Sequence, residues 1–241
     1  MVKISEMFVD IQGEGSLMGQ RCLFIRVVGC GLCDMCLRFC GNVDGSIGMD
    51  ADVDRLSGGL VDIISKRDIR NVVITGGEPM LYVDEFFQVI DSVGKECAGV
   101  LWQFETSGTI PVDLKKTVNY IDNTNVNFVI LPRKDRYFHE SYYGLYRMSL
   151  RYGEPCVMFK FIVYPTGGVP FEDSFPFYNE DEVSVEIFSL IEQGVNRNDI
   201  WLVPFARWVD ELDDIARDVY LLSKMLDVNF SDKLNLRYGM R

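Results

Sequence analysis

The sequence predicts an α/β protein built around a parallel sheet. Six short runs are each nearly continuous in apolar residues, as strands buried on both faces of a parallel sheet are. Longer segments with apolar residues at helical spacing separate these runs. Such an alternation folds either into a doubly wound sheet or into a partial barrel, with ligands bound at the carboxyl ends of the strands.

The expected elements follow one another without an internal repeat or a long linker, so we expect a single domain over residues 1–241. The clearest helices are expected at residues 84–97 and 211–227, where apolar side chains recur at helical spacing. The strands are expected at residues 23–28, 72–75, 100–105, 126–131, 157–164 and 200–204.

The composition argues against several functional classes. Asp and Glu outnumber Lys and Arg by 36 to 24, and the resulting net charge of −12 disfavours direct binding of nucleic acid, because affinity for phosphates depends on basic side chains. No apolar run reaches the roughly 18 residues that a membrane span needs, and the N-terminus does not resemble a secretion signal. We therefore expect a cytoplasmic protein without a direct nucleic-acid or membrane partner.

Four of the seven cysteines are bunched within eleven residues, which indicates a metal or cluster site rather than disulfides. Three thiolates can hold three irons of a [4Fe–4S] cluster and leave the fourth iron open to a ligand. A four-cysteine zinc site is the alternative, although the long spacer that usually separates its cysteine pairs is missing. The candidate ligands are Cys30, Cys33, Cys36 and Cys40, whereas Cys22, Cys97 and Cys156 are expected to be buried apolar residues.

A glycine-rich turn follows the second expected strand. Residues 72–79 combine an apolar strand, two glycines that allow close backbone approach, and the carboxylate of Glu78 followed by proline. This carboxylate can pair with the ammonium group of an amino-acid ligand, and a simple strand-ending turn is the alternative. The cysteines follow the first strand and residues 106–108 follow the third, so parallel strands would bring all three groups to one edge of the sheet.

These motifs resemble the radical S-adenosylmethionine (SAM) superfamily and, in detail, the 7-carboxy-7-deazaguanine synthase family. The resemblance covers nearly the whole chain and implies a partial (β/α)6 TIM-like barrel of the radical SAM type. It also implies a lyase that converts 6-carboxy-5,6,7,8-tetrahydropterin to 7-carboxy-7-deazaguanine with loss of ammonia, on the route to queuosine. The matching segments are residues 4–8 and 11–15, which resemble the family's N-terminal substrate loop, and residues 23–30, 72–79, 105–109, 159–163 and 202–204.

The resemblance also assigns roles to individual residues. Arg26 would bind the substrate carboxylate, a task that suits a planar, bidentate guanidinium. The implied substrate-binding residues are Ile11, Gln12, Gly13, Glu14, Arg26 and Thr75. The implied SAM-binding residues are Gly76, Gly77, Glu78 and Ser107, together with Pro132, Arg133 and Lys134 in a segment that has lost the family's serine. Further implied are Mg²⁺, an electron donor such as flavodoxin or ferredoxin, and a homodimer.

The cluster motif departs from the family pattern. The usual Cys-x3-Cys-x2-Cys spacing is absent, so either Cys30, Cys33 and Cys36 form a motif shortened by one residue, or Cys40 joins Cys30 and one of the other two. The family's Mg²⁺-binding threonine is also missing. The candidate oxygen ligands that remain are Asp34 and Asn42.

The C-terminal region departs as well, because residues 234–237 resemble the family's closing strand without its usual histidine. The single histidine of the chain, His139, is expected to lie at the surface without a catalytic role. Two alternative functions stay open at this point. One is another small radical SAM enzyme, such as a glycyl-radical activase, and the other is a degenerate relative that keeps the fold without catalysis.

Overall fold

The computed structural model describes residues 1–29, 48–123, 125–132, 138–152, 156–164, 177–206 and 208–239. These residues form two compact units, each of which draws on several stretches of the chain. The first unit comprises Met1–Asp10, Arg21–Thr106 and Lys115–Phe128, and the second comprises Ile11–Gln20, Ser107–Leu114 and Val129–Arg241.

The strands of the first unit lie in the order β5-β4-β2-β1-β3. Strands β2, β4 and β5 are parallel, whereas the short β3 runs antiparallel to β1. The middle residues of each parallel strand are buried, and most of them are apolar. The bounds are β1 Val2–Ile11, β2 Arg21–Val27, β3 Met49–Ala51, β4 Asn71–Gly76 and β5 Leu101–Thr106.

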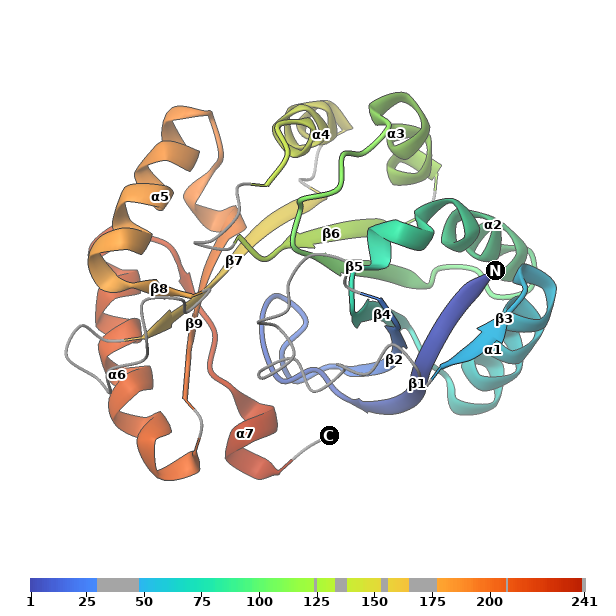
Figure 1. Cartoon of the computed structure of the whole chain (residues 1–241), viewed down its shortest axis with the longest axis horizontal. Helices are drawn as coiled ribbons and strands as arrows, with labels where there is room; N and C mark the ends of the chain where they lie inside the picture. The colour runs from blue at the N-terminus through green and yellow to red at the C-terminus, as the bar shows by residue number, and fades with distance from the viewer. Residues whose placement is uncertain are drawn as a thin grey trace. The chain divides into compact units, whose positions relative to one another are not determined.

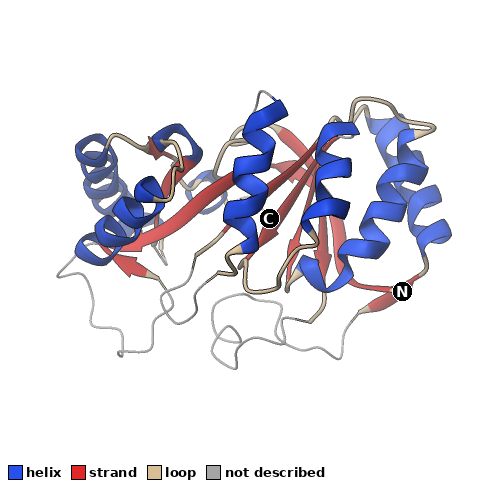
Figure 2. Cartoon of the chain, turned by 90° about the horizontal axis from the view of Figure 1, so that it is seen from above, coloured by secondary structure: helices blue, strands red, loops and turns tan. Residues whose placement is uncertain are grey.

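Helices α1 (Val53–Arg67) and α2 (Val83–Gly94) of this unit pack side by side (Figures 1 and 2). Asp52 is the N-cap of α1, and its side chain accepts a hydrogen bond from Arg55 N at 2.7 Å. The apolar stripe of α2 buries Phe86 and Phe87, whose rings meet Phe104 of β5 edge to face. The unit also contains the 3₁₀ helix η2 (Pro79–Tyr82) and most of α3 (Leu114–Asn123).

The second unit repeats the pattern with the parallel strand order β10-β9-β7, and β8 pairs with β7. Strand β6 (Val126–Ile130) runs from the first unit into the second. The remaining strands are β7 Val157–Tyr164, β8 Tyr178–Asn179, β9 Ile200–Pro204 and β10 Asn229–Phe230. The helices are α4 Ser141–Ser149, η3 Leu150–Tyr152, α5 Glu180–Glu192, η4 Arg197–Asp199, α6 Val209–Leu226 and α7 Leu234–Tyr238.

Helix α5 begins with a complete capping box. Glu182 N donates to Asn179 Oδ1 at 2.9 Å, and Asn179 N donates to Glu182 Oε2 at 3.1 Å. Asn179→Ala removes the first of these bonds, so we expect the free energy of unfolding to fall by about 1 kcal/mol in urea titrations. Val185→Ala, an exposed substitution on the same helix, should change it much less, and equal losses in both variants would contradict the role of the cap.

All six expected strands are confirmed to within about two residues, and the two expected helices correspond to α2 and α6. The α/β class and the parallel pairing are therefore confirmed. The burial expected for Cys22 and Cys156 is confirmed, but Cys97 is partly exposed beside Ser65, so that expectation was wrong for it. His139 is exposed, as expected.

Two expectations about chain ends were wrong. Residues 4–8 were assigned to a substrate loop, yet they lie within strand β1, and the loop begins only after Ile11. Residues 234–237 were assigned to a strand, yet they form helix α7. The alternating apolar residues Leu234 and Leu236 mimic a strand pattern. Leu236 instead packs against the cluster formed by Ala206, Leu212 and Ala216.

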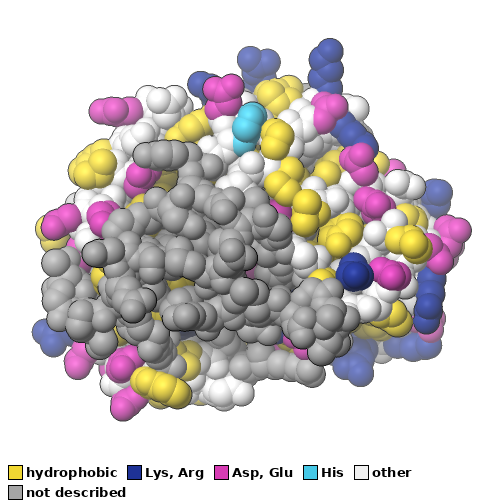
Figure 3. All heavy atoms as spheres, viewed as in Figure 1, with side chains coloured by type: hydrophobic (Ala, Val, Ile, Leu, Met, Phe, Trp, Pro, Cys, Tyr) yellow, Lys and Arg dark blue, Asp and Glu magenta, His cyan; other side chains and the backbone are white. Residues whose placement is uncertain are grey.

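The surface contains both charge signs. Figure 3 shows acidic and basic side chains interspersed with hydrophobic ones around the described part of one face. Among the helices that the structure describes, none combines the length and the apolarity needed to cross a membrane.

Candidate functional site

Arg26 presents an oriented guanidinium on strand β2 of the first unit. Its Nη1 donates to Glu6 Oε1 at 2.5 Å, and the guanidinium lies 5.0 Å from the centre of the Phe8 ring. The Phe8 ring in turn stacks on Phe24. Arg26 is therefore fixed by its own unit while its side chain stays 32% exposed, and its contact with the substrate carboxylate stays a prediction.

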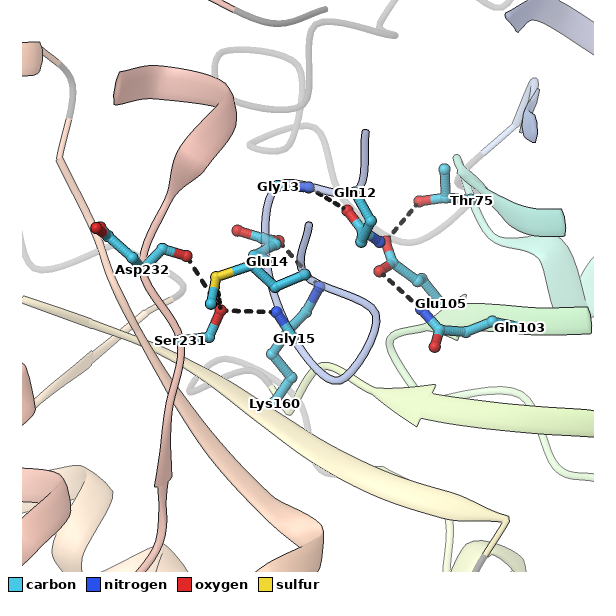
Figure 4. A network of polar contacts seen from close by, with 11 residues as sticks. Gln12, Gly13, Glu14, Gly15, Thr75, Gln103, Glu105, Lys160, Ser231 and Asp232 are labelled. Atoms are coloured by element: carbon cyan, nitrogen blue, oxygen red, sulfur yellow. Dashed lines mark hydrogen bonds and ion pairs between the residues drawn. The ribbon is translucent and has the colours of Figure 1, made fainter. Parts of the chain in front are cut away.

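Thr75 is the register partner of Arg26 on strand β4, so both expected substrate residues lie next to each other on adjacent strands. Thr75 Oγ1 donates to Glu105 Oε2 at 3.1 Å, and Gln103 Nε2 makes a long contact of 3.5 Å with Glu105 Oε1 (Figure 4). Gln103 is 2% exposed, and its buried Oε1 has no hydrogen-bond partner within the described part of the chain. The first unit thus carries a row of polar groups along neighbouring strands.

The glycine turn after β4 packs against the end of β2. Gly77 N donates to Val27 O, and Glu78 N donates to Gly29 O, both at 2.9 Å. A Cβ atom on Gly77 would lie 2.3 Å from Gly29 O, a distance that no side chain can accept. The turn therefore requires glycine at this position, directly beside the residue that precedes Cys30.

Glu78, expected to bind the SAM amino group, is buried. Its Oε1 accepts hydrogen bonds from Met80 N at 3.1 Å and from Thr106 Oγ1 at 2.6 Å. The first of these bonds caps the 3₁₀ helix η2. The carboxylate thus orders the turn in which it lies, and its contact with SAM stays a prediction.

Glu14 lies in the loop after β1, in the second unit, and forms an ion pair with a buried lysine. Lys160 Nζ donates to Glu14 Oε1 at 2.9 Å, and the two side chains are 1% and 17% exposed respectively (Figure 4). Burial, the largest influence, raises the pKa of Glu14, but the charges of Lys160 and Lys233 outweigh it and lower the pKa below its ordinary value. Glu14 is therefore a carboxylate, and its buried Oε2 has no hydrogen-bond partner among the described residues.

The segment that leads into α7 also holds this loop. Gly15 N donates to Ser231 Oγ at 2.8 Å, and Leu234 N donates to Gly13 O at 2.9 Å. Asn235 lies so close that a Cβ atom on Gly13 would be 2.8 Å from Asn235 Oδ1. The C-terminal segment thus fixes residues 13–15, a role that its resemblance to a closing strand did not suggest.

The other expected site residues divide into described and undescribed ones. Ser107 Oγ lies 3.0 Å from Thr109 Oγ1, and Pro132 is buried; both belong to the second unit. Within the described ranges, no group of three or more His, Cys, Asp or Glu residues is arranged to hold a metal ion. The expected residues outside those ranges are Cys30, Cys33, Cys36, Cys40, Arg133 and Lys134, as well as Asp34 and Asn42.

Sequence reasoning missed Lys160, Gln103 and Glu105 as candidate functional residues. A signal was present, because Lys160 lies in an otherwise apolar strand, and Gln103 and Glu105 alternate with apolar residues in β5. A buried charged or amide side chain in such a run needs a specific partner, which is grounds for suspecting a site.

A family model described as a 4Fe-4S single cluster domain matches residues 11–134. Among curated proteins, the 7-carboxy-7-deazaguanine synthase of Hyperthermus butylicus is 26% identical over 98% of this chain and 92% of its own length. The 7-carboxy-7-deazaguanine synthase of Methanospirillum hungatei is 37% identical over 46% of this chain, and the match spans 44% of that relative.

A solved structure, described as the crystal structure of QueE from Escherichia coli, matches 97% of this chain and 94% of its own. The TM-score is 0.55 and the sequence identity is 21%. This likeness confirms that the two chains share a fold of mostly parallel strands and helices, as the sequence led us to expect.

Proposed function

The chain belongs to the family of 4Fe-4S single cluster domains, and from this premise we propose that it is a radical SAM carbon–nitrogen lyase of the 7-carboxy-7-deazaguanine synthase type. Its substrate would be 6-carboxy-5,6,7,8-tetrahydropterin, and its products 7-carboxy-7-deazaguanine and ammonia. The observation that carries this proposal is the similarity to the Hyperthermus butylicus protein of that name over 98% of the chain.

The described polar residues suit such a substrate. A carboxylated pterin offers one anionic group and a ring edge with N–H donors. Arg26 is an oriented cation for the carboxylate, and Thr75 lies beside it in register. Glu14 is a carboxylate whose Oε2 has no partner in the described ranges, which suits an N–H donor from the substrate. Gln12 and Gly13 would hold the same edge, with Gln12 Oε1 accepting a hydrogen bond from Gly13 N at 2.9 Å.

Other residues would hold the SAM and the iron–sulfur cluster. The close packing of Gly77 against the Gly29 backbone explains why the turn has glycine there, and binding of SAM by Gly76, Gly77 and Glu78 is part of the proposal. Ligands for a [4Fe–4S] cluster would come from Cys30, Cys33, Cys36 and Cys40. When bound, the cluster and SAM supply the radical that starts the reaction. The protein's own residues bind the substrate, orient it and exclude water.

Several further properties are part of the proposal. The two units would act together as one catalytic domain, and two chains would form a homodimer. Mg²⁺ would assist substrate binding, flavodoxin or ferredoxin would supply the electron, and the protein would work in the cytoplasm without contacting nucleic acid.

Anaerobic product analysis tests the proposal. The protein is reconstituted with iron and sulfide and incubated with SAM, a reductant and carboxytetrahydropterin, and the mixture is analysed by mass spectrometry. We expect 7-carboxy-7-deazaguanine, together with release of ammonia. Cleavage of SAM without this product would point to another radical SAM activity. Failure to form a cluster that cleaves SAM would refute catalysis altogether.

A further inference from the structure

Lys160 is a lysine in the interior of the second unit, on strand β7. It is 1% exposed, and its neighbours Phe159 and Phe161 are fully buried. An ammonium group in such surroundings is strongly unfavourable unless a counter-charge binds it. Glu14 provides that charge at 2.9 Å, although the two residues are 146 positions apart in the sequence. A purely structural strand position would more simply carry an apolar residue.

The two oxygens of the Glu14 carboxylate differ in their contacts. Lys160 binds Oε1, whereas Oε2 is buried and has no hydrogen-bond partner in the part of the chain that the structure describes. The backbone around Glu14 is also fixed, because Ser231 Oγ accepts from Gly15 N and Leu234 N donates to Gly13 O. A buried carboxylate oxygen without a donor is costly, so a fixed one indicates that a ligand supplies the missing donor.

We propose that Lys160 is a positioning residue for the pterin substrate. Lys160 binds Oε1 of Glu14, and this leaves Oε2 to accept hydrogen bonds from N–H groups of the pterin ring. The inference rests on the proposed function and adds to it a residue on β7, far in sequence from the loop that contacts the ligand. Lys160 itself would act through Glu14 rather than touch the substrate.

Among the described residues, the charges that lower the pKa of Glu14 come from two parts of the chain. Lys160 approaches from β7, and Lys233 from the segment before α7, where its ammonium lies 5.4 Å from the centre of the Phe205 ring. Asp232, on the same segment, is bound by Arg237 at 3.0 and 3.2 Å. Without Lys160, Lys233 alone would oppose the effect of burial, so the pKa of Glu14 would rise and its neutral form would appear at higher pH.

The test is equilibrium binding of the oxidised, non-reactive analogue 6-carboxypterin to the cluster-containing protein, measured at several pH values. Wild-type affinity should change little between about pH 6 and pH 8, because Glu14 stays ionised. In Lys160→Met we expect affinity at pH 7 to fall roughly 10- to 100-fold. That affinity should recover as the pH rises, because deprotonation restores the acceptor. Lys160→Arg keeps the charge and should lose less.

A double-mutant cycle separates positioning from a general loss of structure. Glu14→Gln should bind weakly at every pH, and adding Lys160→Met to it should cost no further affinity, because Lys160 acts only through Glu14. This double variant also removes both buried charges, so it tests the idea even if Lys160→Met alone folds poorly. Lys66→Met, which removes an exposed lysine paired with Asp62, is the matched control and should leave the affinity unchanged.

The outcomes separate this inference from the proposed function. If the wild type does not bind 6-carboxypterin, both fail. If Glu14→Gln weakens binding but Lys160→Met binds as the wild type does at every pH, the function stands and the positioning role is overturned. A further loss of affinity when Lys160→Met is added to Glu14→Gln would also overturn it, because Lys160 would then act independently of Glu14.

Discussion

Gly77→Ala should abolish SAM-dependent activity and destabilise the first unit. The new methyl group would lie 2.3 Å from Gly29 O and 2.7 Å from Gly29 C, and both are backbone atoms that no change of rotamer can move. Overpacking of this kind costs about 3 kcal/mol. In a protein of this size, that corresponds to a fall in melting temperature of roughly 6–12 °C. Thermal unfolding and SAM cleavage assays measure the two effects.

The clash should impair binding of the iron–sulfur cluster as well as stability. Relief requires the backbone at Gly29 to move, and Gly29 directly precedes Cys30, the first candidate cluster ligand. It would also break the hydrogen bonds from Gly77 N to Val27 O and from Glu78 N to Gly29 O. We therefore expect Gly77→Ala to bind less iron and sulfide after reconstitution than the wild type does.

Gly59→Ala is the matched control. Gly59 lies on the exposed side of helix α1, and a Cβ atom there would have no neighbour within 4 Å among the described residues. Alanine has the higher helix propensity, so this variant should gain about 0.5–1 kcal/mol in stability and keep full activity. A Gly77→Ala protein as stable and as active as this control would show that the turn is not packed as described.

The sequence predicted most of the strands well, because each strand of a parallel sheet can be recognised from its own apolar residues. Strands β7 and β9 were predicted with their exact bounds, since each is a single run of mostly apolar residues. Strand β1 was not predicted, because polar and apolar residues are mixed along it. It contains Glu6 and Phe8, whose contacts with Arg26 depend on pairing with a strand that comes later in the chain.

The candidate site was predicted less completely than the framework. Motif order pointed to Glu14 and Arg26, which the structure surrounds with Lys160 and Glu6 respectively. It could not point to Lys160, because the ion pair joins residues 146 positions apart, and only the folded chain brings them together. Helix α7 was misassigned for a related reason, since five residues are too few to show a helical period.

Arg26→Ala should weaken binding of carboxylated pterins selectively. A hydrogen bond to a charged group contributes about 1.5–3 kcal/mol, so its loss corresponds to roughly 10- to 100-fold in affinity. The selectivity should appear when 6-carboxypterin is compared with pterin, which lacks the carboxylate. Wild-type protein should prefer the carboxylated ligand, and Arg26→Ala should bind both about equally. Arg26→Lys should recover only part of the preference, because an ammonium cannot form the bidentate pair.

The loss of affinity in Arg26→Ala has to be separated from the repulsion that the Glu6 carboxylate would exert on the ligand. Arg26→Ala removes the positive charge that Glu6 binds, so the Glu6 carboxylate would repel an anionic ligand and exaggerate the loss. The double variant Arg26→Ala with Glu6→Gln removes that repulsion, so any loss of preference that persists in it belongs to the guanidinium. Arg21→Ala, an exposed arginine on the same strand, should retain the wild-type preference. If the double variant still favoured 6-carboxypterin over pterin as strongly as the wild type does, another group would have to bind the carboxylate.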